Sequence, residues 1–256
     1  MPFWTEHQKV FLGVVSVALL MICWEVLSAQ RILNPFLVSS PSGVAGAAST
    51  TLVNISIWAN VAVTLRDFAV GLALATLVGI PMGIALGWFR RFGYLFDLLL
   101  TAMYNTPRIA LLPLLILWLG LGFYSKIAVV FLAAVFPLLV NTMTGLKTAE
   151  RVYVHMARSF GANQRQILWT VALPGSVPFI VAGFRLASGR ALMSVIAAEF
   201  FLSSEGLGVF LAKSALFFQT SRFLLGILLV AVIGIALSEV TTRIQRRVET
   251  WRPERS

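Results

Sequence analysis

The sequence has few charged residues and a single cysteine. Only 12% of its 256 residues are charged, whereas 59% are hydrophobic. A soluble domain carries about 25% charged residues and cannot hide so much apolar surface from water, so the composition indicates an integral membrane protein. Cys23 lies inside an apolar run and has no second cysteine to pair with, which excludes an intrachain disulfide.

Histidine and acidic residues are also scarce. The chain has ten Asp and Glu residues and two histidines, with no His-Glu-x-x-His zinc motif and no pair of Asp residues inside an apolar run. These absences disfavour a membrane-embedded enzyme, and we expect neither catalytic residues nor a metal site. The other alternative is an ion-coupled secondary transporter. That class commonly shows inverted repeats, and no convincing duplication is visible here.

Six apolar stretches approach or exceed the 20 or so residues that cross a bilayer as a helix. They are Val10–Ala29, Phe68–Phe89, Leu98–Gly122, Ile127–Leu146, Phe179–Leu202 and Phe223–Val240. The sequence therefore predicts an all-α integral membrane protein with six transmembrane helices. The first stretch is longer than the core of a signal peptide and no small-x-small cleavage site follows it, so we expect an uncleaved helix.

A seventh stretch, Val44–Leu65, is uncharged but rich in Ser, Thr and Asn. Only Arg66 and Asp67 separate it from the next apolar stretch, which is too little chain for a comfortable turn between two spans. We expect Val44–Leu65 to form a helix at the outer surface that leads into the second span.

The formal net charge of +10 comes mainly from basic residues in the short segments between the apolar stretches. Twelve Lys and Arg residues fall on one side of the predicted spans, five on the other and three within them. Because Lys and Arg are enriched in cytoplasmic loops, both termini are predicted to be cytoplasmic. This distribution favours membrane lipid, and not nucleic acid, as the partner of the positive charge.

The second span carries small residues at every fourth position: Gly71, Ala75, Gly79, Gly83 and Gly87. Such a stripe lets another helix approach closely and pack by dispersion. We expect close packing there, within the subunit or across a dimer.

The loop at residues 147–178 is long for a small membrane protein. We expect two helices in it. The first stops at Gly161, and the second follows Asn163, which forms a near capping box with Gln166, and runs to Pro174. The loop has more apolar residues than one packed face needs, which fits either a protein docking site or packing on the ends of the spans.

The run Ala157–Ala162, with nine residues between its Gly161 and the sequence Val171-Ala172-Leu173-Pro174, resembles the EAA loop of ABC importer permeases. That pattern is Glu-Ala-Ala, three residues, Gly, nine residues, then Ile-x-Leu-Pro. The sequence departs from it where His155 and Met156 replace Glu and Ala. The resemblance implies an ATPase-docking surface made of His155, Met156, Ala157, Arg158, Phe160, Gly161, Ala162, Leu173 and Pro174.

Further stretches resemble the nitrate/sulfonate/taurine/bicarbonate branch of these permeases. They are Ser39–Ser42, Gly79–Gly83, Ala110–Leu114, Trp118–Gly120, Gly183–Ala187, Ala198–Glu199 and Gly206–Gly208. The likeness implies the MetI-like type I ABC importer permease fold, with one transmembrane permease domain over residues 1–256 and the coupling loop 147–178 within it.

The resemblance also implies partners, a location and a mechanism. In this family two permease copies, here a homodimer, join two ABC ATPase subunits and a periplasmic or lipid-anchored solute-binding protein in the bacterial cytoplasmic (inner) membrane. ATP and Mg bind the ATPase, and none of these cofactors binds the permease. The sequence agrees, because Lys147-Thr148 is not preceded by the glycine of a phosphate loop.

Several ionisable residues lie within the predicted spans, among them Arg108, Arg185, Arg190 and Glu199. Ionisable groups at membrane depth are costly unless paired or wetted, so each is a functional candidate. We expect Asn105, Arg108, Arg190 and Glu199 to belong to the substrate pathway, with the arginines favouring an anion. Pairing with carboxylates or helix-end carbonyls is the alternative, and for Arg185 a structural role is favoured.

Overall fold

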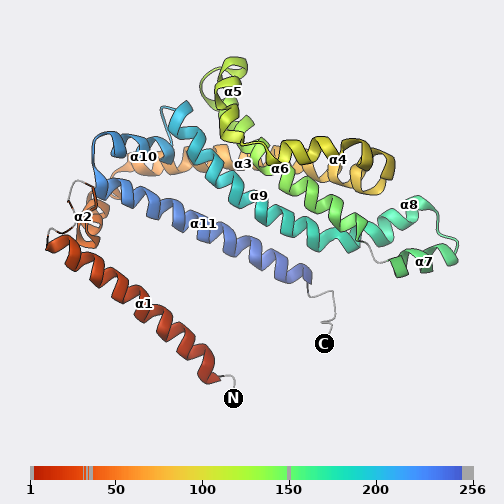
Figure 1. Cartoon of the computed structure of the whole chain (residues 1–256), viewed down its shortest axis with the longest axis horizontal. Coiled ribbons are helices and arrows are strands. Elements are labelled where there is room, and N and C mark those ends of the chain that lie inside the picture. Colours follow the sequence, from red (N-terminus) through yellow and green to blue (C-terminus); the bar gives the residue numbers. More distant parts are fainter. Residues whose placement is uncertain (1–2, 31, 33, 35–36, 149–150, 250–256) are drawn as a thin grey trace.

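The computed structural model describes residues 3–30, 32, 34, 37–148 and 151–249, and this part of the chain contains helices and short connections without strands (Figure 1). In chain order the helices are α1 Phe3–Ala29, α2 Pro41–Thr51, α3 Ile55–Trp88, α4 Arg90–Asn105, η1 Arg108–Leu111, α5 Leu112–Leu119, α6 Phe123–Lys147, α7 Arg151–Ser159, α8 Gln164–Ile167, η2 Leu168–Ala172, α9 Leu173–Leu202, α10 Leu207–Leu216 and α11 Thr220–Glu249.

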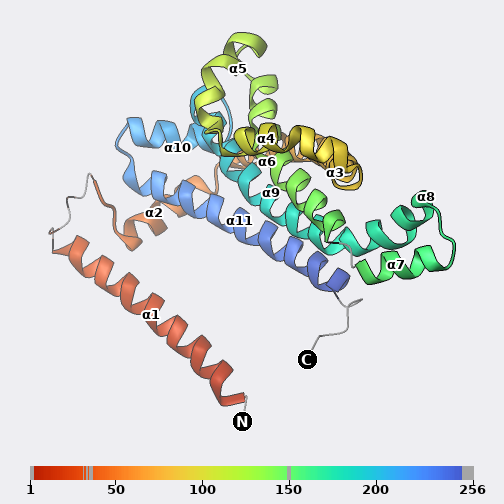
Figure 2. The same cartoon turned by 45° about the vertical axis from the view of Figure 1, so that its right-hand side comes forward.

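Among the residues that the structure describes, five helical stretches are long and apolar enough to cross a membrane. They are Phe11–Ala29, Ile55–Trp88, Phe123–Lys147, Gln164–Phe201 and Thr220–Arg247. Each contains most or all of one predicted span. Helices α7 and α8 lie at one end of the bundle, called here the α7 end, and α2 and α10 lie at the other, the α10 end (Figures 1 and 2). Helix α11 ends toward the α7 end, as the start of α1 does.

The remaining predicted span, Leu98–Gly122, is not one helix. Helix α4 ends at Asn105, Thr106 is extended with ψ of 129°, and η1 and the eight-residue α5 follow. Pro107 explains the break, because a residue that precedes proline is disfavoured in the helical region. The segment still connects the two ends of the bundle, since α3 ends at the α7 end and α6 begins at the α10 end (Figures 1 and 2).

The stretch Val44–Leu65 does not form one surface helix, and that prediction is wrong. Helix α2 ends at Thr51, and Asn54 caps a new helix by accepting a hydrogen bond from the Ser56 N–H at 3.0 Å. Helix α3 then runs without interruption through Arg66 and Asp67. Because Asn54 starts a second helix inside the stretch, the polar side chains that follow Asn54 belong to the long helix α3 and not to a separate surface helix.

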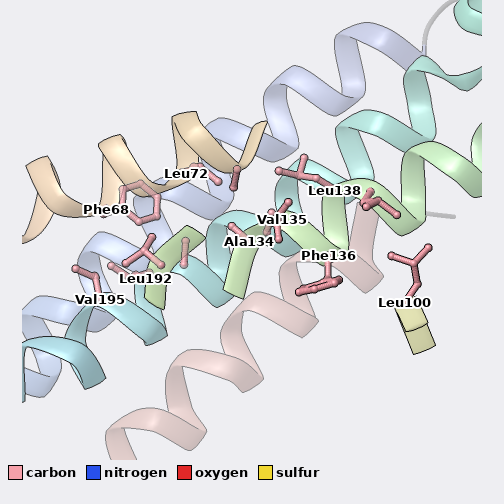
Figure 3. Packing of buried hydrophobic residues seen from close by; sticks show 14 of the residues in the cluster. Phe68, Leu72, Leu100, Ala134, Val135, Phe136, Leu138, Leu192 and Val195 are labelled. Carbon is pink, nitrogen blue, oxygen red and sulfur yellow. The ribbon is translucent and has the colours of Figure 1, made fainter. Parts of the chain in front are cut away.

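Helix α6 forms the centre of the bundle, between α3 and α9 (Figure 3). Phe68 and Leu72 of α3 and Val195 of α9 pack against its buried apolar side chains. The small-residue stripe of α3 faces α6, so the expected close packing occurs within the subunit. A Cβ added at Gly83 would lie 2.6 Å from the Thr142 Cβ of α6.

Helix α1 lies apart from the rest of the bundle (Figures 1 and 2). The carboxyl-terminal end of α1 contacts the segment before α2 through a 2.8 Å hydrogen bond from the Trp24 indole N–H to the Ser39 carbonyl. It also contacts α2, because the Glu25 carboxylate accepts hydrogen bonds from the Ser42 hydroxyl at 2.7 Å and from the Ser42 N–H at 3.0 Å. Apolar side chains such as Phe11, 67% exposed, cover its surface. In a bilayer such a surface lies against lipid or another subunit.

Candidate functional site

Helices α7 and α8 form the predicted helix pair, and local signals fix the turn between them. The Gly161 N–H bonds the Arg158 carbonyl at 2.9 Å and the Ala162 N–H bonds the Ala157 carbonyl at 3.0 Å, with Gly161 at φ 81°. Asn163 then caps α8: its side chain accepts from the Gln166 N–H at 2.9 Å, and its own N–H donates to the Gln166 side chain at 2.8 Å. The helix end and the capping box are both confirmed.

Helix α7 has two faces of different chemistry. Tyr153, Met156 and Phe160 follow one another at helical spacing and are exposed, Phe160 by 86%. His155 and Arg158 lie on the opposite side at 3.6 residues per turn and line a cavity. The predicted docking residues therefore divide: Met156 and Phe160 are on the exposed apolar face, whereas His155 and Arg158 are on the cavity face.

The second helix of the loop does not end at Pro174, so that prediction is wrong. Helix α8, the π-helical turn η2 and α9 run continuously from Gln164 to Leu202. Proline has no backbone N–H, so the regular hydrogen bonding of an α-helix is interrupted at Pro174. The π turn directly before it changes the hydrogen-bonding pattern there and lets the helical stretch continue. Ile167 and Ala172 are buried at this junction, whereas Pro174 is exposed. Residues 164–202 therefore form one continuous helical stretch.

The cavity lies between α7, the adjoining ends of α3 and α6, and the start of α4, and has a volume of about 1150 Å³. Among the lining residues that the structure describes, Arg91, Lys147 and Arg158 are charged, and His155 lies among them. Aromatic side chains, Trp88 among them, line the α3–α4 part. We call this space the basic cavity.

Arg190 is half-buried on α9 and is held by α4. Its guanidinium donates a 2.9 Å hydrogen bond to the Tyr104 hydroxyl and lies 5.0 Å from the centre of the Tyr104 ring. Arg185 is exposed one turn nearer the α7 end, with Gln245 of α11 at 3.5 Å, which fits the structural role expected for it.

The break in the third span lies beside this arginine. Asn105 is the last residue of α4 and Arg108 the first of η1; their side chains lie outside the described part of the structure. Because Tyr104 precedes Asn105 directly, the structure brings the break and Arg190 together. Glu199 is nine residues further along α9, about 14 Å away along the helix axis.

Glu199 is fully buried at the α10 end and joins three parts of the chain. Its carboxylate accepts hydrogen bonds from the Thr64 hydroxyl of α3 at 2.8 and 3.0 Å and from the Gly208 N–H of α10 at 2.8 Å. The Leu207 N–H donates to Thr64 at 2.9 Å, and the Gly206 N–H donates to Asn60 at 2.8 Å. The carboxylate thus lies at the amino end of α10, where negative charge is favoured.

A second buried polar group at this end was missed by the sequence reasoning. Asp67 of α3 is fully buried and pairs with Lys126 of α6, which is 4% exposed, and with the partly exposed Arg66 at 2.8 Å. Lys126 also lies 3.3 Å from Ser203, which follows α9. These contacts join α3, α6 and α9.

One signal in the sequence could have revealed this cluster. Asn60, Thr64 and Asp67 recur at helical spacing, so a single helix through this stretch places all three on one face. Treating Arg66 and Asp67 as the end of a surface helix concealed that face. The partners Lys126 and Glu199 carry no such local signal.

In the part of the chain that the structure describes, no three His, Cys, Asp or Glu side chains gather in a way that could hold a metal ion. The polar groups at the α10 end are paired with one another. Their geometry holds helix ends together.

Comparisons with known proteins identify the family to which this architecture belongs. Residues 75–250 match the model of the family described as binding-protein-dependent transport system inner membrane component. The taurine transport system permease protein of Escherichia coli K12 is 30% identical, over 98% of this chain and 93% of that protein. The formylaminopyrimidine transport permease protein of Halalkalibacterium halodurans is 30% identical over 91% and 93%, and a putative aliphatic sulfonates transport permease protein of Bacillus subtilis 168 is 26% identical over 94% and 87%.

Solved structures agree on the fold. A chain of the MetNI methionine ABC transporter in an inward-facing conformation superposes with a TM-score of 0.67 at 18% identity, over 79% of this chain and 98% of that one. The expected MetI-like permease fold is thereby confirmed. The chain belongs to the binding-protein-dependent transport system inner membrane component family, in its nitrate/sulfonate/taurine branch, and is a membrane-spanning ABC transporter permease and not an enzyme.

Proposed function

We propose that this permease carries a small anionic organic solute of the sulfonate class into the cytoplasm, driven by a separate ATPase subunit. Family membership supports the permease role, and the names of the taurine and sulfonate relatives support the solute class. ATP and Mg belong to the ATPase in this proposal, since the chain lacks a phosphate loop.

The exposed apolar face of α7 carries the coupling proposal. Met156 of α7 and Phe160, the first residue after this short helix, are 52% and 86% exposed, and the turn at Gly161 follows them. Apolar side chains that stay exposed beside water are typical of a protein docking site. Of the two sequence-based readings, docking is favoured for these two residues, whereas Ile167 is buried against the bundle.

Force applied to α7 has a short route into the membrane. The hydrogen-bonded turn at Gly161 and the Asn163 capping box connect α7 to α8, and α8 continues through η2 into α9. Closure of the ATPase against α7 would therefore tilt α9 and switch the pathway between its inward-facing and outward-facing states. Residues 147–178 are the coupling loop of a single permease domain in this proposal.

The proposed assembly has two copies of this permease, two ATPase subunits and an external solute-binding protein. The family description, binding-protein-dependent transport, supports the last of these. The α7 end is cytoplasmic in this proposal, in a bacterial inner membrane, which places the excess of Lys and Arg on the cytoplasmic side as well as both termini.

The proposed pathway passes the break in the third span. Asn105 and Arg108 flank Pro107 there, and Arg190 lies alongside through its bond to Tyr104. A guanidinium has five N–H donors, so a bond to one tyrosine leaves donors for a sulfonate. Glu199 would act differently, as a closure at the outer end of the pathway, because its carboxylate is bonded to α3 and α10.

Reconstitution tests this function. The permease, its ATPase and its binding protein are assembled in proteoliposomes, and uptake of labelled taurine is measured together with ATP hydrolysis. Met156→Ser with Phe160→Ser should reduce both rates at least tenfold, because the docking face loses its apolar contacts. Normal uptake by a well-assembled double variant would refute the coupling proposal. Arg190→Gln should instead reduce taurine uptake and leave assembly intact.

A further inference from the structure

The basic cavity has a composition that neither the fold nor the coupling proposal requires. Its charged lining residues, Arg91, Lys147 and Arg158, come from three separate helices, and none of the described lining residues is acidic. Like charges that converge repel one another unless an anion or water lies between them. A space of about 1150 Å³ leaves room for such an anion.

The basic groups lie within reach of one another across the cavity. A Cβ added at Gly93, in the first turn of α4, would lie 3.9 Å from the Lys147 amine, so this amine extends from the end of α6 to the start of α4. Arg91 precedes that position by two residues, and Arg158 lines the space from α7. All three side chains are exposed to the cavity and its opening.

The α4 side of the cavity is apolar and continues as a row of exposed apolar residues along α4. Phe89 and Phe92, with ring centres 6.1 Å apart, line the cavity and are 55% and 54% exposed. Further along α4, Leu95, Leu98 and Leu99 are also exposed, at helical spacing from Phe92. A polar, positively charged recess thus opens onto an apolar stripe.

We propose that the basic cavity binds the phosphate headgroup of an anionic phospholipid, with an acyl chain along the apolar stripe of α4. Neither a free phosphate ion nor an acidic protein segment carries an acyl chain that would cover the apolar stripe. Basic pockets between helix ends bind anionic headgroups, and aromatic residues favour the level of the headgroups. The leaflet is the cytoplasmic one, which rests on the proposed orientation.

The lipid and the ATPase then use opposite faces of α7. His155 and Arg158 face the headgroup, whereas Met156 and Phe160 remain available for docking. Bound lipid would support α7 from the membrane side and hold it at a fixed distance from the ends of α3 and α6.

The test uses the full permease chain in detergent without its ATPase, so it is independent of the coupling proposal. Native mass spectrometry measures the affinity for phosphatidylglycerol and for phosphatidylcholine with the same acyl chains. Phosphatidylglycerol should bind more tightly. Arg91→Gln with Lys147→Gln should weaken its binding about 25-fold, at about fivefold per basic residue, and leave phosphatidylcholine unchanged.

Two further variants control for charge and folding. Arg246→Gln removes one positive charge from the exposed end of α11, which does not line the cavity, and should bind as the unaltered chain does. Arg91→Lys with Lys147→Arg keeps the charge and should bind within about twofold.

Two results would overturn the proposal. One is equal binding of phosphatidylglycerol by the double Gln variant and the unaltered chain. The other is displacement of the lipid by millimolar inorganic phosphate, which would make the cavity a site for a free anion.

Discussion

Gly83→Ala tests the close packing of α3 on α6, on which the bundle depends. The added Cβ would lie 2.6 Å from the Thr142 Cβ and 2.7 Å from the Leu139 carbonyl oxygen, whereas ordinary contact begins at 3.4 Å. The two helices must therefore part by about 0.8 Å, and both obstacles are on the α6 backbone or directly attached to it. Overpacking of this kind costs about 1–3 kcal/mol.

This cost converts to a shift of about 5- to 150-fold in the unfolding equilibrium. Thermal unfolding of the purified chain in detergent, followed by circular dichroism, would measure it. Gly189→Ala is the matched control, because a Cβ at that position of α9 meets nothing within 4 Å and alanine is the better helix former. If Gly83→Ala unfolds at the same temperature as Gly189→Ala, the packing argument is refuted.

Three further predictions concern the polar groups and the loop. Glu199→Ala should destabilise the chain by about 3 kcal/mol, because it strands buried donors such as the Gly208 N–H, and faster amide exchange at Gly208 would confirm the mechanism. Asp67→Asn should cost about 3–5 kcal/mol in thermal unfolding by leaving Lys126 buried without a counter-charge, and adding Lys126→Met should restore most of it; no recovery would contradict the account. Gly161→Ala should cost about 1–2 kcal/mol at φ 81° and lower coupled transport, whereas Gly161→Asn should retain more of both, and equal loss in the two variants would count against the turn as the cause.

Local sequence signals were good predictors wherever the structure obeys local rules. The helix end at Gly161 and the capping box of Asn163 and Gln166 each depend on a few neighbouring residues, and the structure has both. The four-residue spacing of the α3 glycines predicted close packing in the same way. It could not say which helix approaches, because α6 is distant in sequence.

Two errors concern residues that were expected to lie at a helix boundary and lie inside a continuous helical stretch instead. Pro174 normally limits a helix, but the π turn before it and the buried side chains of Ile167 and Ala172 keep α8 and α9 continuous. Asp67 was taken for a boundary between helices, and its partner Lys126, on another helix, allows it to be buried instead.

The candidate site could be predicted in part. The resemblance placed the docking loop at residues 147–178 as a whole, but treated its residues as one surface. Only the structure divides α7 between an exposed apolar face and the basic cavity. The charged residues of the cavity come from three helices, and no motif in the sequence connects Arg91 with Lys147 and Arg158.

Cysteine cross-linking tests the central claim, that the exposed face of α7 docks on the ATPase, most directly. Cys23 is replaced by serine, which leaves no other cysteine in the chain, and either Phe160 or Arg158 is replaced by cysteine. In the assembled transporter, treated with a short bifunctional reagent reactive with cysteine and lysine, the Phe160→Cys chain should cross-link to the ATPase, and the Arg158→Cys chain, facing the basic cavity, should not. Cross-linking from Arg158→Cys alone, or from neither, would contradict the account.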